Sequence, residues 1–210
     1  MKVPKQAPGR PKPDSPPRGT SPLKHCTLYD AGEVGAMLDA MAAHAAALLA
    51  GRPATLVGIL RRGAPLAAML HERLARDHCR ADLARVDVRI QRYADDLRLL
   101  HPETRLTEDP AQAGLDFTGR CVLLVDDVLY RGHSLLRALD WASRRGAAEV
   151  RVAVLADRRV ALLPVHADVV GAQLQVAPDD VVECHVPPYE PELAIVLVRP
   201  RRGPPPGDAT

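Results

Sequence analysis

The amino-acid sequence predicts an α/β domain in which a central, mainly parallel β-sheet is flanked by helices. Three observations support this fold class. Short apolar runs of strand length alternate with longer segments of helical periodicity, and this alternation implies right-handed crossovers and a parallel sheet. The chain of 210 residues is long enough to bury a core of domain size. Hydrophobic residues make up 47% of the chain and aromatic residues only 3%, so Ala, Val and Leu must build that core.

The first half of the domain is predicted to supply two helices and two strands. Residues 32–49 are rich in Ala, carry apolar side chains at helical spacing and precede Gly51, a natural helix stop. The apolar run at residues 55–60 predicts a buried strand. Residues 65–76 predict a second helix with a proline in its first turn, and residues 86–90 alternate as a strand does.

The second half begins with a long polar segment, residues 92–118, which lacks clear periodicity. A loop of this length in a compact domain usually has a function. Residues 121–125 form the most strand-like run of the chain, and residues 134–145 predict a helix that ends at Gly146. Further strands are predicted at residues 150–155, 169–170, 181–183 and 194–198.

Both ends of the chain are predicted to be disordered tails around one folded domain, residues 25–198. Residues 1–24 are basic and contain seven prolines, and residues 199–210 have a similar composition. Of the 28 Lys and Arg residues, six lie in the first tail and three in the last, with one of the 26 acidic residues in each, so the domain has a net charge of −5. Every lysine lies in the first tail. A mildly acidic, lysine-free domain argues against nucleic-acid binding through overall charge.

The sequence also bears on location and on metal sites. No run approaches the ~18 apolar residues of a membrane span, and no apolar stretch follows the basic first residues as in a secretory signal. We therefore expect a cytoplasmic protein with no membrane partner. The four cysteines are scattered without a C-x-x-C pair, which predicts neither a disulfide framework nor a zinc site.

One segment carries the pattern of a ligand site. The strand at residues 121–125 leads into Asp126 and Asp127, and the turn at residues 131–134 then opens a helix. Ligands of parallel sheets bind beyond the carboxyl ends of the strands. Two carboxylates there can accept hydrogen bonds from vicinal hydroxyls, and a helix N-terminus offers N–H groups and a positive dipole end to a phosphate. The pattern predicts a ribose 5-phosphate site; the alternative is that the two aspartates form only a polar turn.

A wider pattern supports the ligand site. The segment VLLVDDVLYRGHS resembles the phosphoribosyl pyrophosphate (PRPP) signature of type I phosphoribosyltransferases, and in particular of the pyrimidine-operon regulator/uracil phosphoribosyltransferase family. Three other segments resemble that family in the same order, namely LVGILRRGAPLA, YADDL and DRRVALLPVHADVVG. The resemblance covers residues 30–198.

The resemblance implies a type I phosphoribosyltransferase fold with a mobile lid at about residues 93–117 and a small hood built from chain-terminal segments. It implies PRPP and a pyrimidine base as substrates, with uracil converted to UMP, and Mg²⁺ as the cofactor. It also implies a homo-oligomer. The catalytic residues would be Asp126, Asp127 and Arg62, with both aspartates in the Mg²⁺ shell. The substrate-binding residues would be Arg61, Gly63, Val128, Leu129, Tyr130, Arg131, Gly132, His133, Ser134, Tyr93, Asp95 and Asp96.

Several positions depart from the family pattern. Arg131 and Ser134 stand where the phosphate loop has threonines, and Ala94 stands where an arginine precedes the Asp-Asp pair of the lid. Binding is therefore better supported than turnover. Two alternatives remain open: a nucleotide-sensing regulator that binds RNA of a pyrimidine operon with weak or no catalysis, and a binding protein with neither activity. The acidic, lysine-free domain favours the enzyme over the RNA-binding regulator.

Overall fold

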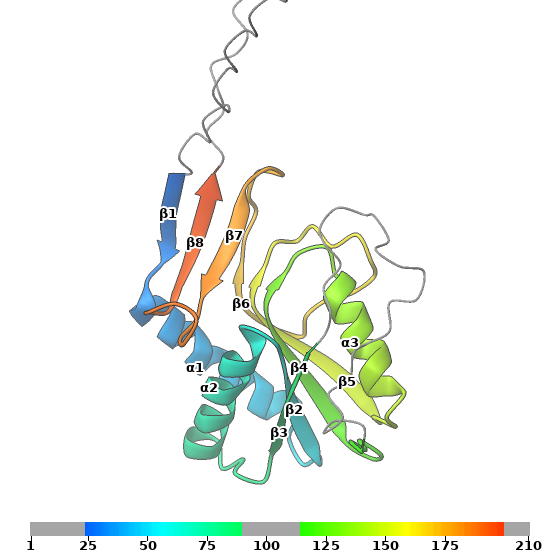
Figure 1. The fold of residues 1–210 in the computed structure, drawn as a ribbon. Coiled ribbons are helices and arrows are strands. Elements are labelled where there is room, and N and C mark those ends of the chain that lie inside the picture. Colours follow the sequence, from blue (N-terminus) through cyan, green and yellow to red (C-terminus); the bar gives the residue numbers. More distant parts are fainter. Residues whose placement is uncertain (1–23, 90–113, 200–210) are drawn as a thin grey trace, which may run out of the picture.

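The computed structural model describes residues 24–89 and 114–199 (Figure 1). Its centre is a parallel sheet, as the sequence predicts, and the strand order in this sheet is β3-β2-β4-β5-β6. The strands are β2 (Ala54–Ile59), β3 (Ala84–Val88), β4 (Cys121–Leu129), β5 (Glu149–Asp157) and β6 (Val169–Gln173).

The helices cover both faces of this sheet because the side chains of β4 point alternately to opposite faces. Leu123 and Val125 face α1 (Ala31–Leu48) and α2 (Gly63–Asp77) in one core cluster. Val122 and Leu124 face α3 (His133–Ser143) in a second cluster. Since both faces of β4 are buried, the strand is apolar at consecutive positions rather than at every second one.

A second, antiparallel sheet with the strand order β1-β8-β7 lies beside the first (Figure 1). It consists of β1 (Lys24–Tyr29), β7 (Val181–His185) and β8 (Ala194–Arg199). This sheet, called the hood below, has the place that the resemblance implies for a hood. Strand β1 was not predicted from the sequence, and Lys24 and Arg199 were expected in the tails. In the structure these two residues are opposite each other in the ladder between β1 and β8.

The end of the predicted lid also differs from expectation. Phe117 is buried, its ring packs edge-on against that of Trp141 with centroids 5.5 Å apart, and its N–H donates to the Arg145 carbonyl. It belongs to the core on the α3 face, because an aromatic ring gains more from this contact than from solvent. Residues 90–113, the rest of the predicted lid, lie outside the described residues. Within the described residues, no helix combines the length and apolar character needed to cross a membrane.

Candidate functional site

The two aspartates lie inside β4 and not beyond its end, which corrects the sequence analysis. Pairing with β2 stops at Val125, whereas pairing with β5 continues to Leu129. Pairing with β5 therefore keeps Asp126 and Asp127 in the strand, whereas on the β2 side these two residues have no neighbouring strand. Both side chains are nearly buried, with relative exposures of 2% and 5%. The sequence does not show this extension because a polar pair after an apolar run is also typical of a turn.

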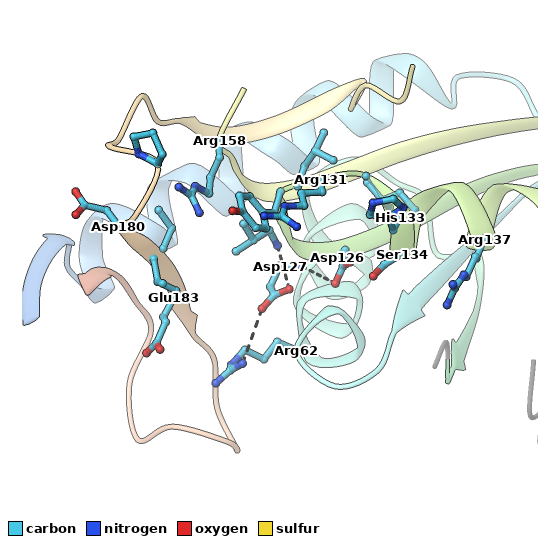
Figure 2. A pocket seen from close by; sticks show the side chains of 18 of the residues that line it. Arg62, Asp126, Asp127, Arg131, His133, Ser134, Arg137, Arg158, Asp180 and Glu183 are labelled. Atoms are coloured by element: carbon cyan, nitrogen blue, oxygen red, sulfur yellow. Dashed lines mark hydrogen bonds and ion pairs between the residues drawn. The ribbon is translucent and has the colours of Figure 1, made fainter. Parts of the chain in front are cut away.

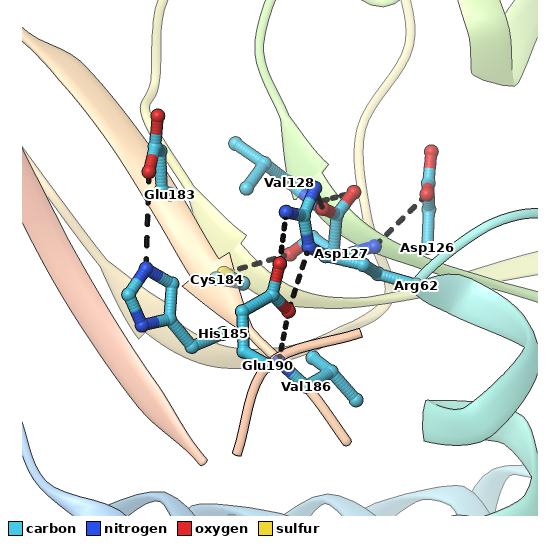
Figure 3. Close-up of polar contacts among 9 residues, drawn as sticks. All are labelled: Arg62, Asp126, Asp127, Val128, Glu183, Cys184, His185, Val186 and Glu190. Carbon is cyan, nitrogen blue, oxygen red and sulfur yellow. Dashed lines mark hydrogen bonds and ion pairs between the residues drawn. The ribbon is translucent and has the colours of Figure 1, made fainter. Parts of the chain in front are cut away.

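Backbone N–H groups order both carboxylates. Asp126 accepts from the N–H of Asp127 at 2.9 Å, and Asp127 accepts from the N–H of Val128 at 3.0 Å. The thiol of Cys184, on the hood strand β7, lies 3.6 Å from the carbonyl oxygen of Asp127 (Figure 3). Burial raises the pKa of this thiol well above its ordinary value, so Cys184 stays protonated and acts as a donor at neutral pH.

The loop after β4 forms the N-terminus of α3. Gly132 is the N-cap, with φ of +86°, a conformation that glycine adopts at no steric cost. No side chain caps this helix, and its first turn holds no acidic residue. The first N–H groups of α3 are thus not used by a side-chain cap, and with the helix dipole they favour an anion.

These parts surround one cavity of about 810 Å³ (Figure 2). It brings together Arg62, the two aspartates and all seven predicted binding residues of the segment 128–134. Other lining residues were not predicted from the sequence: Leu135, Arg137, Arg158, Pro178, Asp179, Asp180, Val181, Val182 and Glu183.

The α3 end of the cavity is basic, whereas the hood end carries charges of both signs. Arg131 and Arg137 lie on the α3 side, whereas Arg158, Asp180 and Glu183 lie on the hood side (Figure 2). An anion is therefore favoured at the α3 end.

Arg62 lies between two carboxylates. Its Nε donates to Oε2 of Glu190 at 3.2 Å and its NH2 group donates to Oε1, while NH1 is 4.0 Å from Oδ2 of Asp127 (Figure 3). The hydrogen bond to Glu190 raises the pKa of Arg62 and the same bond lowers the pKa of Glu190, in each case against the effect of burial. Both groups stay charged at neutral pH. Glu190 was not predicted from the sequence, because it lies in an aperiodic segment rich in proline.

Comparison with known proteins decides the family. The model of the phosphoribosyl transferase domain matches residues 27–192. The chain belongs to this family. The match includes all the described residues that line the cavity, and the chain is a transferase by family.

Individual relatives agree with the family. A protein of Actinobacillus pleuropneumoniae named Bifunctional protein PyrR is 37% identical over 145 residues, which cover 69% of this chain and 79% of the relative. A protein of the same name from Roseiflexus is 36% identical over 158 residues, 73% of this chain and 83% of the relative. Among solved structures, a hypoxanthine phosphoribosyltransferase of Trypanosoma cruzi matches with a TM-score of 0.62 at 21% identity, covering 83% of this chain and 97% of that one. This structural likeness shows the phosphoribosyltransferase fold.

Two of the residues that are expected to bind substrate have other neighbours in the structure. The Arg61 guanidinium lies 5.2 Å from the ring centroid of Tyr189, and Arg61 does not line the cavity. A Cβ atom on Gly63 would lie 2.3 Å from the carbonyl oxygen of Val125. A side chain at this position would therefore collide with β4, which explains why a glycine stands here. That Gly63 also contacts the substrate stays a prediction. Tyr93, Asp95 and Asp96 lie outside the described residues.

Proposed function

We propose that this phosphoribosyltransferase transfers the ribose 5-phosphate group of PRPP to uracil and forms UMP and pyrophosphate. One observation carries the proposal: two nearly buried carboxylates and an uncapped helix N-terminus follow each other along the chain and line the same cavity. A pair of hydroxyl-binding carboxylates next to a phosphate cradle fits a ribose 5-phosphate group. The names of the curated relatives support a pyrimidine as the base.

Each part of the cavity has a role in this reaction. The loop at residues 131–134 and the first turn of α3 hold the 5-phosphate. Asp126 and Asp127 accept hydrogen bonds from the ribose hydroxyls and stabilise positive charge that develops on the sugar ring. The bond between the anomeric carbon and pyrophosphate breaks, pyrophosphate leaves with the electron pair, and the base nitrogen forms the new bond and loses its proton. Arg62 faces the leaving group, and its hydrogen bonds to Glu190 are replaced by hydrogen bonds to pyrophosphate oxygens.

The donor set at this site fits Mg²⁺. Mg²⁺ binds through one or two carboxylates together with substrate phosphates, and Asp126 and Asp127 are the carboxylates beside the proposed phosphate positions. When bound with PRPP, the ion supplies charge neutralisation on the pyrophosphate. The protein contributes position, a desolvated site and the Arg62 cation.

The test is a turnover assay of the full chain with PRPP, Mg²⁺ and one base per reaction: uracil, cytosine or hypoxanthine. We expect nucleotide and pyrophosphate to form with uracil. Asp127→Asn should lower PRPP affinity by about 1.5–3 kcal/mol, the value of a charged hydrogen bond, with little change in thermal stability. Asp140→Asn, an exposed aspartate on α3 paired with Arg144, is the matched control and should behave as the wild type. If Asp127→Asn lowers the melting temperature but leaves PRPP affinity unchanged, the aspartate pair stabilises the fold and does not bind the ribose.

A second candidate function is regulation through RNA. The relatives carry the word bifunctional in their names, and the resemblance to pyrimidine-operon regulators implies RNA binding. Because the domain is net acidic and its lysines lie at its N-terminal edge and beyond, we expect any RNA affinity to depend on the tails and to fall steeply with salt. Binding of a pyrimidine-operon leader, measured at two salt concentrations with and without residues 1–23, tests this. Tight and sequence-selective RNA binding by the shortened chain would favour the regulatory function over the transfer of ribose 5-phosphate to uracil.

A further inference from the structure

The loop that follows β7, residues 186–193 and called the hood loop below, contacts the two residues that precede α2. Arg62 donates from Nε and from its NH2 group to the two carboxylate oxygens of Glu190. Beside this pair, the guanidinium carbon of Arg61 lies 5.2 Å from the ring centroid of Tyr189. Two consecutive arginines before α2 thus hold two consecutive residues of the hood loop.

The middle of the hood loop adds little to the core. Val186, at its start, is fully buried, and Leu193, at its end, packs partly on the core. Residues 188–192 are exposed, apart from the half-buried Glu190. The position of this middle stretch therefore depends strongly on its contacts with the two arginines.

Both hydrogen-bonding edges of the Arg62 guanidinium already face carboxylates. The edge formed by Nε and NH2 binds Glu190, and NH1 lies 4.0 Å from Oδ2 of Asp127 (Figure 3). Asp127 belongs to β4, and its carboxylate accepts from the N–H of Val128 at 3.0 Å, whereas Glu190 lies on a loop. An anion that binds Arg62 through two hydrogen bonds must therefore displace Glu190.

Resting on the proposed function, we infer that Arg62 and Glu190 form an autoinhibitory clasp between the pyrophosphate position and the hood loop. Pyrophosphate on Arg62 displaces the Glu190 carboxylate and releases the middle of the loop, while the contact between Arg61 and Tyr189 keeps it nearby. The carboxylate thus stays at a high effective concentration and competes with pyrophosphate for the same donors. The clasp lowers the affinity for pyrophosphate mainly because it speeds the release of this product.

Three backbone N–H groups are sensitive to the state of the clasp. Val186 donates to Oε2 of Glu190 at 2.8 Å, and Tyr189 and Glu190 donate to the carbonyl oxygen of Val186 at 3.0 and 3.4 Å. The two residues between Val186 and Tyr189 are prolines, which have no N–H. Hydrogen exchange of the stretch 186–190 therefore measures these three bonds.

The test is hydrogen exchange of the full chain in Mg²⁺ alone and in Mg²⁺ with saturating pyrophosphate. We expect pyrophosphate to accelerate exchange of the three amides about three- to tenfold. Residues 195–198 of β8 should not change, because their ladders with β1 and β7 do not depend on the clasp.

Two variants of the hood loop complete the test. Glu190→Gln should exchange faster than the wild type without pyrophosphate and respond little to it. In stopped-flow measurements this variant should also release pyrophosphate about three- to tenfold more slowly. Glu192→Gln, at an exposed position of the same loop, is the matched control and should respond to pyrophosphate as the wild type does.

The outcomes separate the clasp from the proposed function. If calorimetry with Mg²⁺ shows no binding of pyrophosphate to the wild type, the proposed function fails and the clasp fails with it. If pyrophosphate binds but leaves exchange of the three amides unchanged or slows it, the inference is wrong while the proposed function stands. Should the glutamine variant not fold, Glu190→Asp withdraws the carboxylate from Arg62 by one methylene group. Exchange should then be faster than in the wild type, and equal exchange would overturn the inference.

Discussion

The guanidinium of Arg62 and the carboxylate of Glu190 form a two-point hydrogen-bonded pair between the start of α2 and the loop after β7 (Figure 3). The side chains are 26% and 18% exposed, so the pair is partly shielded from water. Glu190 also accepts from the N–H of Val186 at 2.8 Å, which fixes the carboxylate on the hood. The arginine proposed to receive pyrophosphate is thus already bound to an anion.

We first predict that Glu190→Gln increases the affinity for pyrophosphate. In the wild type, Arg62 must break its hydrogen bonds to the Glu190 carboxylate before it binds pyrophosphate, and this carboxylate also repels the incoming anion. The neutral amide of glutamine binds Arg62 more weakly and does not repel pyrophosphate. The expected gain is about 0.5–1.5 kcal/mol, a few-fold to about tenfold in dissociation constant. Calorimetry with pyrophosphate and Mg²⁺ measures it, and Glu192→Gln, an exposed neighbour, is the control. Weaker binding by Glu190→Gln would mean that Glu190 positions Arg62 for the substrate.

A pH dependence of stability follows from the same pair. The hydrogen bond from Arg62 lowers the pKa of Glu190 below its ordinary value of 4.5. A carboxylate with a depressed folded pKa stabilises the fold fully above its unfolded pKa, and this contribution disappears as the pH falls through the folded pKa. The difference in unfolding free energy between wild type and Glu190→Gln should therefore be constant from pH 7 to about 5.5 and shrink below pH 4.5. Urea unfolding at several pH values measures it, and a difference that grows toward acid would contradict the assignment.

The parts of the site that are contiguous along the chain could be predicted from the sequence. The strand, the two aspartates and the loop into α3 form one segment, and local periodicity together with the helix start gives their order along the chain. Glu190 could not be found in this way. Its importance comes from its contact with Arg62, which is distant along the chain, and no local pattern specifies such a contact.

The same reasoning explains the errors in the fold. The parallel sheet follows from apolar runs that are buried on both faces. Strand β1 has the sequence KHCTLY, in which polar residues obscure any alternation, and it is a strand because β8 pairs with it from the far end of the chain. The extension of β4 through Asp126 and Asp127 likewise depends on β5, whose pairing continues after β2 has stopped. Tertiary pairing overrides local preference in both cases.

The packing of Gly63 gives a prediction about stability. A Cβ at this position would lie 2.3 Å from the carbonyl oxygen of Val125, and backbone atoms of β4 cannot yield as a flexible side chain does. Gly63→Ala should therefore destabilise the protein by about 1–3 kcal/mol, the usual cost of overpacking. Gly35→Ala in α1 is the matched control, because nothing lies within 4 Å of its added methyl group, and it should stabilise the helix by up to about 1 kcal/mol. Equal effects of the two changes in chemical denaturation would contradict the packing argument.

Arg131, which replaces a threonine of the family pattern, gives the last prediction. Its guanidinium carbon lies 5.2 Å from the ring centroid of Tyr130, and the residue lines the cavity beside the N-terminus of α3. A threonine there would offer one neutral hydrogen bond to the 5-phosphate, whereas an arginine offers charge-assisted bonds that are roughly twice as strong. We expect Arg131→Thr to weaken UMP binding by about 1–2 kcal/mol.

Uridine distinguishes the phosphate contact from other causes of that loss. It has the same base and ribose as UMP but no phosphate, so Arg131→Thr should leave its affinity unchanged if the cation acts on the phosphate. Arg144→Thr, at the exposed C-cap of α3, controls for the loss of one positive charge and should affect neither ligand. If Arg131 instead crowds the loop, the threonine variant should bind UMP more tightly and turn over faster. Unchanged UMP affinity would contradict both roles, because a side chain that neither contacts nor obstructs the phosphate has no effect on the difference between the two ligands.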